Sequence, residues 1–417
     1  MRYNSTMKKE TAFLTELLAI DSAGGEPAPG APFGAGVRNC LDLFLAKAEE
    51  LGLKTINYAG YAGEAYIGTG AESVGVFAHL DTVPAGEGWT TRTGEVRDGS
   101  IWGRGAIDDK GPAAACLYAL ARLKRRENKL KRRVRLIVGC NEESGSGCMK
   151  YFNAHAEPVT LGFTPDSDFP YVQCEKSILQ LRLSLPFGLP ITVSGGQRAN
   201  VVCAEAAYTK QGKTFIFRGK AAHAMEPHKG DNAAWKLFDA LKTLYPANAV
   251  LQSVCAYLAN PAAIRNLGIC ASDERSGSAT INIGVVRTEK ERLNITLDLR
   301  LPIPSTKETV IRQLKKAMPQ ADVQELYYAP YLYADPNSDL VRTLGKIYTT
   351  ETGKPARGLI TGGGTYARTV KNCVAFGPAL PDVSYNIHDA DEHIPLEHFA
   401  FLQNIYYKAM KALADDR

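Results

Sequence analysis

The sequence lacks long hydrophobic runs and any strong excess of one charge. No stretch of about 18 apolar residues occurs in its 417 residues, so we expect no membrane span and no membrane partner. Lys and Arg total 49 and Asp and Glu total 44, and the resulting net charge of +5 argues against an obligate nucleic-acid partner. Apolar residues at 45% and charged residues at 22% are ordinary globular usage, which excludes a disordered or collagen-like chain.

The nine cysteines form no CxxC pair, and their number is odd. This pattern argues against a disulfide framework and favours reduced, mostly buried thiols in a cytoplasmic protein. The N-terminal segment has only a short apolar stretch, interrupted by Thr15 and Glu16, and no cleavage-site signature. We therefore expect no signal peptide and a cytoplasmic location.

One stretch, residues 122–133, is strongly basic, with eight of its twelve residues Lys or Arg. Nucleic-acid binding is one interpretation, but no aromatic residue interleaves the run and no known binding motif accompanies it. Because the run follows a predicted helix and precedes a predicted strand, a solvated helix end is the favoured interpretation. We predict no nucleic-acid partner.

Three short apolar runs each end in histidine or acidic residues. Residues 74–78 lead to His79 and Asp81, residues 134–139 lead to Glu142 and Glu143, and residues 160–163 lead to Asp166 and Asp168. Runs of this length, separated by helical stretches, are typical of strands in an α/β layer. Ligands of open α/β sheets bind beyond the carboxyl ends of the strands, so we expect these side chains to converge at one edge.

From about Ser177 the pattern changes to that of a separate domain. Residues 293–301 alternate strictly between aliphatic and polar side chains, which is typical of a sheet with one buried and one polar face. After Asp335 the chain returns to the earlier α/β pattern. We therefore predict an α/β protein in which residues 1–177 and 331–417 form an α/β/α domain, interrupted by an inserted α+β domain at residues 178–330.

Each candidate cluster also has a plain structural interpretation. His79 and Asp81 fit a metal-binding imidazole whose second ring nitrogen is held by a carboxylate, or a strand-end histidine beside a solvated aspartate. Asp108 and Asp109 follow two glycines that could aim one carboxylate inward, or they form a surface turn.

The remaining candidates divide in the same way. Glu142 and Glu143 could act as metal ligand and base, or lie in a solvated acidic loop. Asp166 lies in a proline-flanked turn, and His388 lies in a polar loop. A two-metal site would explain all of these strand ends with one cause. Imidazole and carboxylate donors without thiolates favour catalytic Zn, Mn or Co.

The stretch from Val74 to Pro112 closely resembles the co-catalytic metallopeptidases that include carboxypeptidases, aminoacylases and dipeptidases. Other details look most like the bacterial PepV-type dipeptidases, also called Xaa-His or carnosinase-like. These details are the loop at residues 31–34 and the segments VPAGEGW, FTPDSDFP and AAHAMEPHKGDNA. The resemblance runs from about Leu14 to Leu402 and implies an α/β/α catalytic domain with an inserted α+β lid domain.

The resemblance also implies two divalent metal ions, zinc or alternatively manganese or cobalt, and a role for each candidate. Glu142 would be the general base, and Asp81 would orient the first histidine. The peptide that joins Asp108 to Asp109 is often cis in the family. The metal ligands would be His79 and Asp166 for the first ion, Asp108 as a bridge between both ions, and Glu143 and His388 for the second ion.

Substrate contacts are implied by the same resemblance. His223 resembles a lid histidine that stabilises the developing oxyanion, while Asn200 and Arg300 resemble residues that hold the ends of the substrate. From the residue pattern alone, His223 could instead cap a turn and Arg300 would be solvated. The family includes monomers and homodimers, and in dimers the lid histidine can act across the interface. A catalytic-domain loop lining the cleft would contain Gly363, Gly364 and Thr365.

The implied reaction is hydrolysis of the peptide bond of dipeptides with a free N-terminus. A hydroxide bridging the two metals would attack the carbonyl carbon, and Glu142 would take up and return the proton. The alternatives are an N-acyl amino acid deacylase or carboxypeptidase of the same superfamily, and a non-catalytic binding module. Departures from the family pattern at residues 174–177 and 388–392 leave the expected ligands intact but affect the rim of the pocket.

Overall fold

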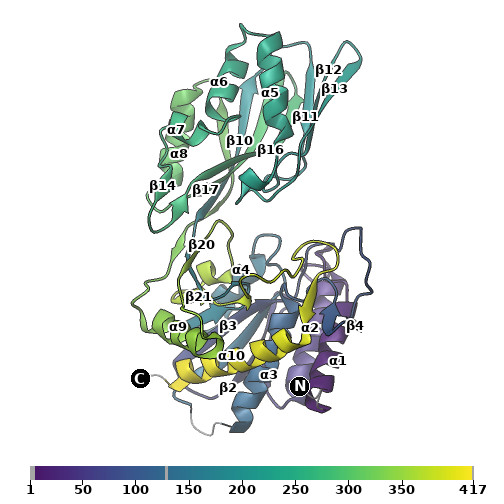
Figure 1. Ribbon diagram of the computed structural model, residues 1–417, viewed down its shortest axis with the longest axis vertical. Coiled ribbons are helices and arrows are strands. Elements are labelled where there is room, and N and C mark those ends of the chain that lie inside the picture. The colour runs from purple at the N-terminus through teal and green to yellow at the C-terminus, as the bar shows by residue number, and fades with distance from the viewer. Residues whose placement is uncertain (1–4, 127–129, 416–417) are drawn as a thin grey trace. The chain divides into compact units, whose positions relative to one another are not determined.

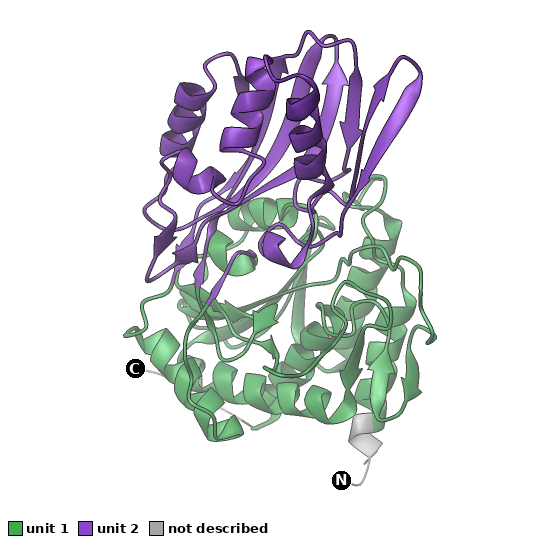
Figure 2. Ribbon diagram, turned by 45° about the horizontal axis from the view of Figure 1, so that its top comes forward, with its two compact units in different colours: residues 1–173, 334–359, 365–417 green, residues 174–333, 360–364 purple. Residues whose placement is uncertain are grey.

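The computed structural model describes residues 5–126 and 130–415, which divide into two compact units (Figures 1 and 2). Unit 1 comprises residues 1–173, 334–359 and 365–417, and unit 2 comprises residues 174–333 and 360–364. Residues 127–129 of the basic run lie outside the described residues.

The largest sheet of the described residues is mixed and has the strand order β1-β2-β6-β3-β7-β21-β9-β19, and β20 also pairs with β9. Its first six strands belong to unit 1, β9 and β20 are divided between the units, and β19 belongs to unit 2. The strands β6, β3, β7 and β21 are parallel neighbours at its centre. The chain passes from unit 1 to unit 2 within β9. The strands are β1 (Lys54–Tyr58), β2 (Ala62–Ile67), β3 (Ser73–His79), β6 (Arg133–Gly139), β7 (Leu161–Thr164), β9 (Val172–Glu175), β19 (Leu332–Tyr333), β20 (Leu359–Thr361) and β21 (Cys373–Ala375).

Helices cover both faces of this sheet (Figure 1). The helices α3 and α10 pack against one face, where Val76 and Leu136 belong to the main core. On the other face α4 carries Phe152, whose ring lies 6.3 Å from that of Phe77. The helices of unit 1 are α1 (Ser5–Ala19), α2 (Ala35–Glu50), α3 (Lys110–Arg126), α4 (Gly147–His155), η2 (Tyr366–Thr369), α9 (Asp339–Thr352) and α10 (Leu396–Asp415).

Short strands outside the largest sheet complete unit 1. Two small sheets join segments that are far apart in the sequence: β22 pairs with β8, and β23 pairs with β5, which pairs with β4. Their bounds are β4 (Glu95–Arg97), β5 (Ser100–Trp102), β8 (Ser167–Asp168), β22 (Pro378–Ala379) and β23 (His393–Pro395).

A buried ion pair crosses from β2 to β6 within this sheet. Glu64 and Arg135 are each 1% exposed, and Nε and Nη2 of Arg135 each donate to one carboxylate oxygen of Glu64 over 2.7 Å. Such a two-pronged pair satisfies both buried charges. Arg135 lies in the amino-terminal half of β6, at the opposite end of the strand from Glu142.

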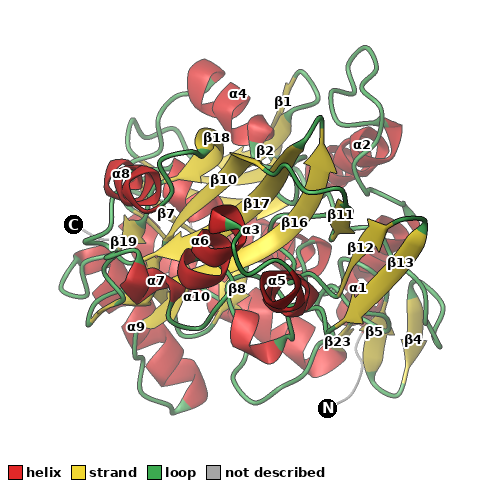
Figure 3. Cartoon of the chain, turned by 90° about the horizontal axis from the view of Figure 1, so that it is seen from above, coloured by secondary structure: helices red, strands yellow, loops and turns green. Residues whose placement is uncertain are grey.

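Unit 2 contains an antiparallel sheet with the order β13-β12-β11-β16-β17-β10-β18 (Figure 3). The aliphatic row of residues 293–301 pairs with the leucines of β10 and packs under α5, α6 and α8, as the alternating pattern predicted. The bounds are β10 (Ser177–Pro186), β11 (Thr192–Gly195), β12 (Glu205–Lys210), β13 (Lys213–Arg218), β14 (Ser272–Asp273), β15 (Gly277–Ser278), β16 (Thr280–Glu289), β17 (Arg292–Leu301), β18 (Asp322–Ala329), η1 (Pro227–Lys229), α5 (Ala233–Leu244), α6 (Ala249–Tyr257), α7 (Ala263–Asn266) and α8 (Lys307–Ala317).

These two units confirm the predicted α/β class, with an α/β/α unit interrupted by an α+β unit. One short segment differs from the expected boundaries, since residues 360–364 belong to unit 2. Lys176 donates its backbone N–H to Thr361 over 3.0 Å, and Arg300 donates to the Gly362 carbonyl over 2.6 Å. These contacts hold the segment to unit 2, although the flanking residues return to unit 1.

The cysteines are all free, and all but Cys255 and Cys270 are buried, as the sequence predicted. Within residues 5–126 and 130–415, no helix combines the length and apolar character that crossing a bilayer requires.

Candidate metal centre

The candidate ligands meet at the carboxyl ends of the parallel strands. His79 is the last residue of β3 and lies opposite Gly139 of β6, so Glu142 and Glu143 follow at the same edge. Asp166 follows β7, which pairs with β3 on its other side. Because parallel strands end at a common edge, three strand ends bring His79 and these carboxylates together.

Asp108 enters the same site from the loop that precedes α3. The peptide bond between Asp108 and Asp109 is cis. Asp109 is fully buried, and its Oδ2 accepts a hydrogen bond of 3.0 Å from the backbone N–H of His79. The start of α3 is thereby tied to the end of β3.

The carboxylate of Asp108 lies between two imidazoles. Its Oδ1 is 3.0 Å from Nε2 of His79, and its Oδ2 is 2.9 Å from Nε2 of His388. His388 Nε2 also lies 3.2 Å from Oε1 of Glu143, and His79 Nε2 lies 3.6 Å from Oδ1 of Asp166. A carboxylate with each oxygen facing a different histidine has the arrangement expected of a bridge between two ions.

Two groups of side chains in this cluster could each hold a metal ion. One consists of His79, Glu142 and Asp166, and the other of His79, Asp108 and Glu143. Within each group the potential ligand atoms all lie within 4.8 Å of one another. Nitrogen and carboxylate oxygen donors suit Zn, Mn or Co, so the residues present fit the ions that the donor chemistry implies.

Asp81 organises this cluster in a way that the sequence did not predict. Nδ1 of His79 lies 2.9 Å from the backbone carbonyl of Asp81 and 3.5 Å from its carboxylate. The carboxylate instead accepts hydrogen bonds from the backbone N–H groups of Glu142 and Glu143, over 2.9 and 3.1 Å. Asp81 therefore orients the histidine mainly through its main chain and the two glutamates through its side chain.

The crowding of acidic groups strongly perturbs their protonation. Burial raises the pKa of Asp166 to about 7, even though the neighbouring His79 lowers it. Burial, together with the charge of Asp166, also raises the pKa of Glu142 well above its ordinary value. Partial desolvation would lower the pKa of the half-exposed His388, but hydrogen bonds to Asp108 and Glu143 raise it to about 11. A site that stabilises positive charge in this way suits divalent cations.

Three predicted substrate residues gather within unit 2. Val201 forms a β-bridge with His223, and the N–H of Ala224 donates to the Asn200 carbonyl over 2.9 Å. Thr280, the register partner of Arg300, donates its hydroxyl to the carbonyl of Ala224 over 3.1 Å. Asn200, His223 and Arg300 therefore belong to one connected region of unit 2.

Arg300 is buried, so its interpretation as a solvated strand residue is wrong. It is 3% exposed, and its Nε and Nη2 donate to the carboxylate of Asp298 over 2.6 and 3.1 Å. Asp298 is fully buried as well and also accepts from Gln180. Nη1 of Arg300 also donates to the Gly362 carbonyl over 2.6 Å, so the segment 360–364 contacts the polar row of β17 at this residue.

The loop expected to line the cleft is divided between the units. Gly363 and Gly364 belong to unit 2, and the N–H of Gly363 donates to Oγ1 of Thr361 over 3.0 Å. Thr365 belongs to unit 1 and caps η2, because its Oγ1 accepts from the N–H of Ala367 over 3.1 Å. The structure thus gives Thr365 a helix-capping role.

Sequence reasoning assigned no role to three buried residues beside the ligands: Arg104, Asp109 and Glu392. Each is at most 7% exposed. Adjacency to Asp108 was a signal for Asp109. The spacing from His388 to Glu392 was noted only as part of a family pattern, and nothing in the local sequence marks Arg104 as its partner.

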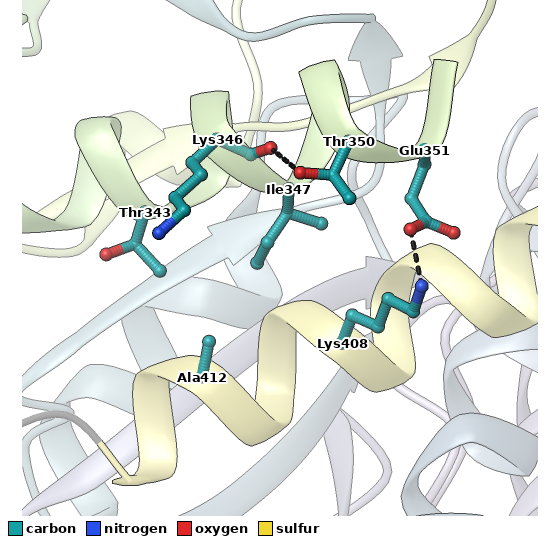
Figure 4. Close-up of a pocket in the computed structure, with 7 residues that line it drawn as sticks. All are labelled: Thr343, Lys346, Ile347, Thr350, Glu351, Lys408 and Ala412. Atoms are coloured by element: carbon teal, nitrogen blue, oxygen red, sulfur yellow. Dashed lines mark hydrogen bonds and ion pairs between the residues drawn. The ribbon is translucent and has the colours of Figure 1, made fainter. Parts of the chain in front are cut away.

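Two cavities lie away from this cluster. One, of about 360 Å³, lies between α9 and α10 and is lined by Lys346, Ile347 and the ion pair of Glu351 with Lys408 (Figure 4). The other, of about 470 Å³, lies in unit 2 beside β11 and β12. Neither is lined by a residue of the acidic cluster.

Comparison of the sequence with known families and proteins gives consistent matches. The profile described as peptidase family M20/M25/M40 matches residues 75–412. The Bacillus subtilis (strain 168) protein YtjP, which carries the provisional name dipeptidase, is 34% identical over 444 residues, with 96% of each chain covered. A Staphylococcus aureus (strain USA300) protein with the same provisional name is 30% identical over 450 residues, again with 96% of each covered.

Solved structures share the fold over nearly the whole chain. Human carnosine dipeptidase 1 has a TM-score of 0.63 at 15% identity, covering 98% of this chain and 96% of the other. Aminoacylhistidine dipeptidase from Vibrio alginolyticus has a TM-score of 0.61 at 14% identity, covering 97% and 96%. The Bacillus subtilis YXEP protein, described as a dinuclear metal-binding peptidase, has a TM-score of 0.59 at 12% identity, covering 99% of both chains. These likenesses establish the fold.

Proposed function

The chain belongs to the peptidase family M20/M25/M40, and we propose that it is a dinuclear metallo-dipeptidase acting on dipeptides with a free N-terminus. The observation that carries the proposal is the cluster in which Asp108 lies between His79 and His388, with three further carboxylates at the same sheet edge. Its relatives of 34% and 30% identity, provisionally named dipeptidases, support this substrate class over others in the family.

The proposed metal ligands divide into two sets that share Asp108. His79 and Asp166 would hold the first ion, and Glu143 and His388 the second. The ions, zinc or alternatively manganese or cobalt, would supply an activated water as nucleophile and a Lewis acid for the scissile carbonyl. Asp81 fixes the ligand geometry through its hydrogen bonds to His79, Glu142 and Glu143.

Glu142 is the proposed general base. Its backbone is fixed by the hydrogen bond to Asp81, and its side chain lies in the group formed with His79 and Asp166. It would take the proton from the attacking water and deliver it to the leaving amine, and this double use is typical of a carboxylate general acid and base.

Unit 2 is the proposed lid, and its clustered polar residues would contact the substrate. His223 would stabilise the oxyanion, and one such donor contributes about 3 kcal/mol. Arg300, whose guanidinium is fixed by Asp298, would pair with the substrate carboxylate, and Asn200 would hold the substrate beside it. Gly363, Gly364 and Thr365 would line the substrate cleft.

A substrate series tests this assignment without altering the protein. We expect the metal-loaded enzyme to release free amino acids from unmodified dipeptides. C-terminal amidation should lower kcat/KM by about 10- to 100-fold, because a hydrogen bond to a charged group, such as the proposed one from Arg300, contributes about 1.5 to 3 kcal/mol. N-acetylation should lower kcat/KM as well, because the proposed substrates carry a free N-terminus. Steady-state kinetics with one dipeptide and its two blocked forms provides the measurement.

The same series distinguishes the alternatives. A deacylase would prefer N-acetylated amino acids, and a carboxypeptidase would accept longer peptides and N-blocked substrates. A binding module would bind metal and release no amino acid from any member of a dipeptide panel, and that result would rule out the proposed activity.

A further inference from the structure

Glu392 is a fully buried carboxylate that contacts the loop carrying Asp108. Its Oε1 accepts hydrogen bonds from the backbone N–H groups of Ile107 and Asp108, over 3.0 and 3.2 Å. Its backbone carbonyl accepts from the N–H of Gly103 over 2.9 Å. One residue near the C-terminal end of the chain thereby fixes the main chain that leads into the proposed bridging ligand.

Arg104 holds the second oxygen of this carboxylate. Its Nη1 donates to Oε2 of Glu392 over 2.6 Å, and its Nη2 lies 3.2 Å from both the Ala85 and the Asp389 carbonyls. The guanidinium also lies 5.5 Å from the centre of the Trp89 ring. The pair therefore connects three loops, at residues 85–89, 103–109 and 389–392.

The third of these loops begins directly after His388. That residue has φ of 64°, an uncommon value for a residue with a side chain, so surrounding contacts must hold it in place. Asp391 provides one anchor, because its carboxylate accepts four hydrogen bonds from the backbone and hydroxyl groups of Thr90 and Thr91. The pair formed by Glu392 and Arg104 provides the second anchor. Unlike Asp391, this pair also contacts Asp108.

We propose that Glu392, held by Arg104, is a positioning residue that sets the separation of Asp108 and His388 and thereby the affinity for the second metal ion. Glu392 contacts the main chain of Asp108 directly, and Arg104 contacts the carbonyl next to His388. The inference rests on the proposed metal-dependent function. It concerns metal binding, which is measured without substrate.

The test is a titration of purified, metal-free protein with Zn²⁺, Mn²⁺ or Co²⁺, comparing wild type with Glu392→Gln. The glutamine keeps an acceptor for the two N–H groups but presents an amide to Arg104 and leaves the guanidinium without an anion. We expect affinity for the second ion to fall 10- to 100-fold, as when a group that orients a ligand is removed. The visible absorption of the second Co²⁺ should change as well.

Glu64→Gln is the matched control, because Glu64 is an equally buried carboxylate paired with an arginine in the same unit. Both variants should lower Tm, and only Glu392→Gln should weaken metal binding. Equal metal affinities for wild type and Glu392→Gln, or an equal loss in Glu64→Gln, would overturn the proposal.

A second variant keeps the proposal testable if Glu392→Gln fails to fold. Arg104→Lys retains the charge but loses the donors to Ala85 and Asp389, so affinity for the second ion should fall about 10-fold. Unchanged affinity would contradict the positioning role. Wild type that binds two ions without cleaving dipeptides would refute the proposed function alone, while wild type that binds no ion would refute both.

Discussion

Replacing Glu142 by alanine should reduce kcat by about 1,000-fold, because a positioned general acid and base contributes about 10²- to 10⁴-fold to a rate. The loss corresponds to about 4 kcal/mol of transition-state stabilisation. The measurement is kcat for a dipeptide at saturating metal. Glu157→Ala is the control, since Glu157 has an exposed side chain that pairs with Arg133 at the surface.

Metal content decides between two roles for Glu142. The structure groups its carboxylate with His79 and Asp166 as a possible ion site, whereas the proposed mechanism makes it the base. If Glu142 is the base, the alanine variant should retain both ions with little change in affinity. A variant that loses one ion in parallel with its activity would identify Glu142 as a ligand, and unchanged activity would exclude both roles.

Asp108→Asn should abolish tight binding of both metal ions and lower activity at least as much as the Glu142 variant. The reason is geometric, since one oxygen of Asp108 faces His79 and the other faces His388. The neutral amide keeps the shape but removes the negative charge that would lie between two cations. Elemental analysis of the purified protein measures the number of ions per chain.

His388→Ala provides the contrast for that experiment. Among the described residues, the ion pairs of His388 are with Asp108 and Glu143, and Asp166 pairs instead with His79. This variant should therefore lose one ion and keep the other, while Asp108→Asn loses both. Loss of a single ion in Asp108→Asn would show that Asp108 is a terminal ligand of one ion and would refute the bridge.

The sequence was most informative where local pattern and global fold coincide. Buried parallel strands appear in the sequence as short apolar runs. Their ends, and the candidate ligands that follow them, could therefore be placed at one edge of a sheet from the sequence alone. The strict alternation in residues 293–301 predicted β17 equally well. These signals lie within about ten residues of the side chains that they locate.

Features that depend on distant contacts could not be predicted in this way. Glu392 contacts Ile107 across 285 positions of sequence, and nothing near either residue marks the pair. Arg300 has a solvated pattern, yet it is buried and donates a hydrogen bond to a segment about 60 residues later in the chain. Residues 360–364 likewise join unit 2 through hydrogen bonds to Lys176 and Arg300, which no local composition reveals.

The point where the chain enters and leaves unit 2 has a consequence for folding. Cys174 and Tyr333 are register partners in β9 and β19, so the 160 residues from 174 to 333 begin and end on adjacent strands. As an unfolded loop, such a length would cost about 4 kcal/mol more to close than a two-residue turn, since each doubling adds about 0.6 kcal/mol. Once unit 2 has folded, its two ends already lie on adjacent strands. The entropic cost of closing the loop is then offset by the contacts formed inside unit 2. The candidate ligands lie on both sides of unit 2 in the sequence. Folding of unit 2 first would therefore bring them together at the lowest cost in chain entropy.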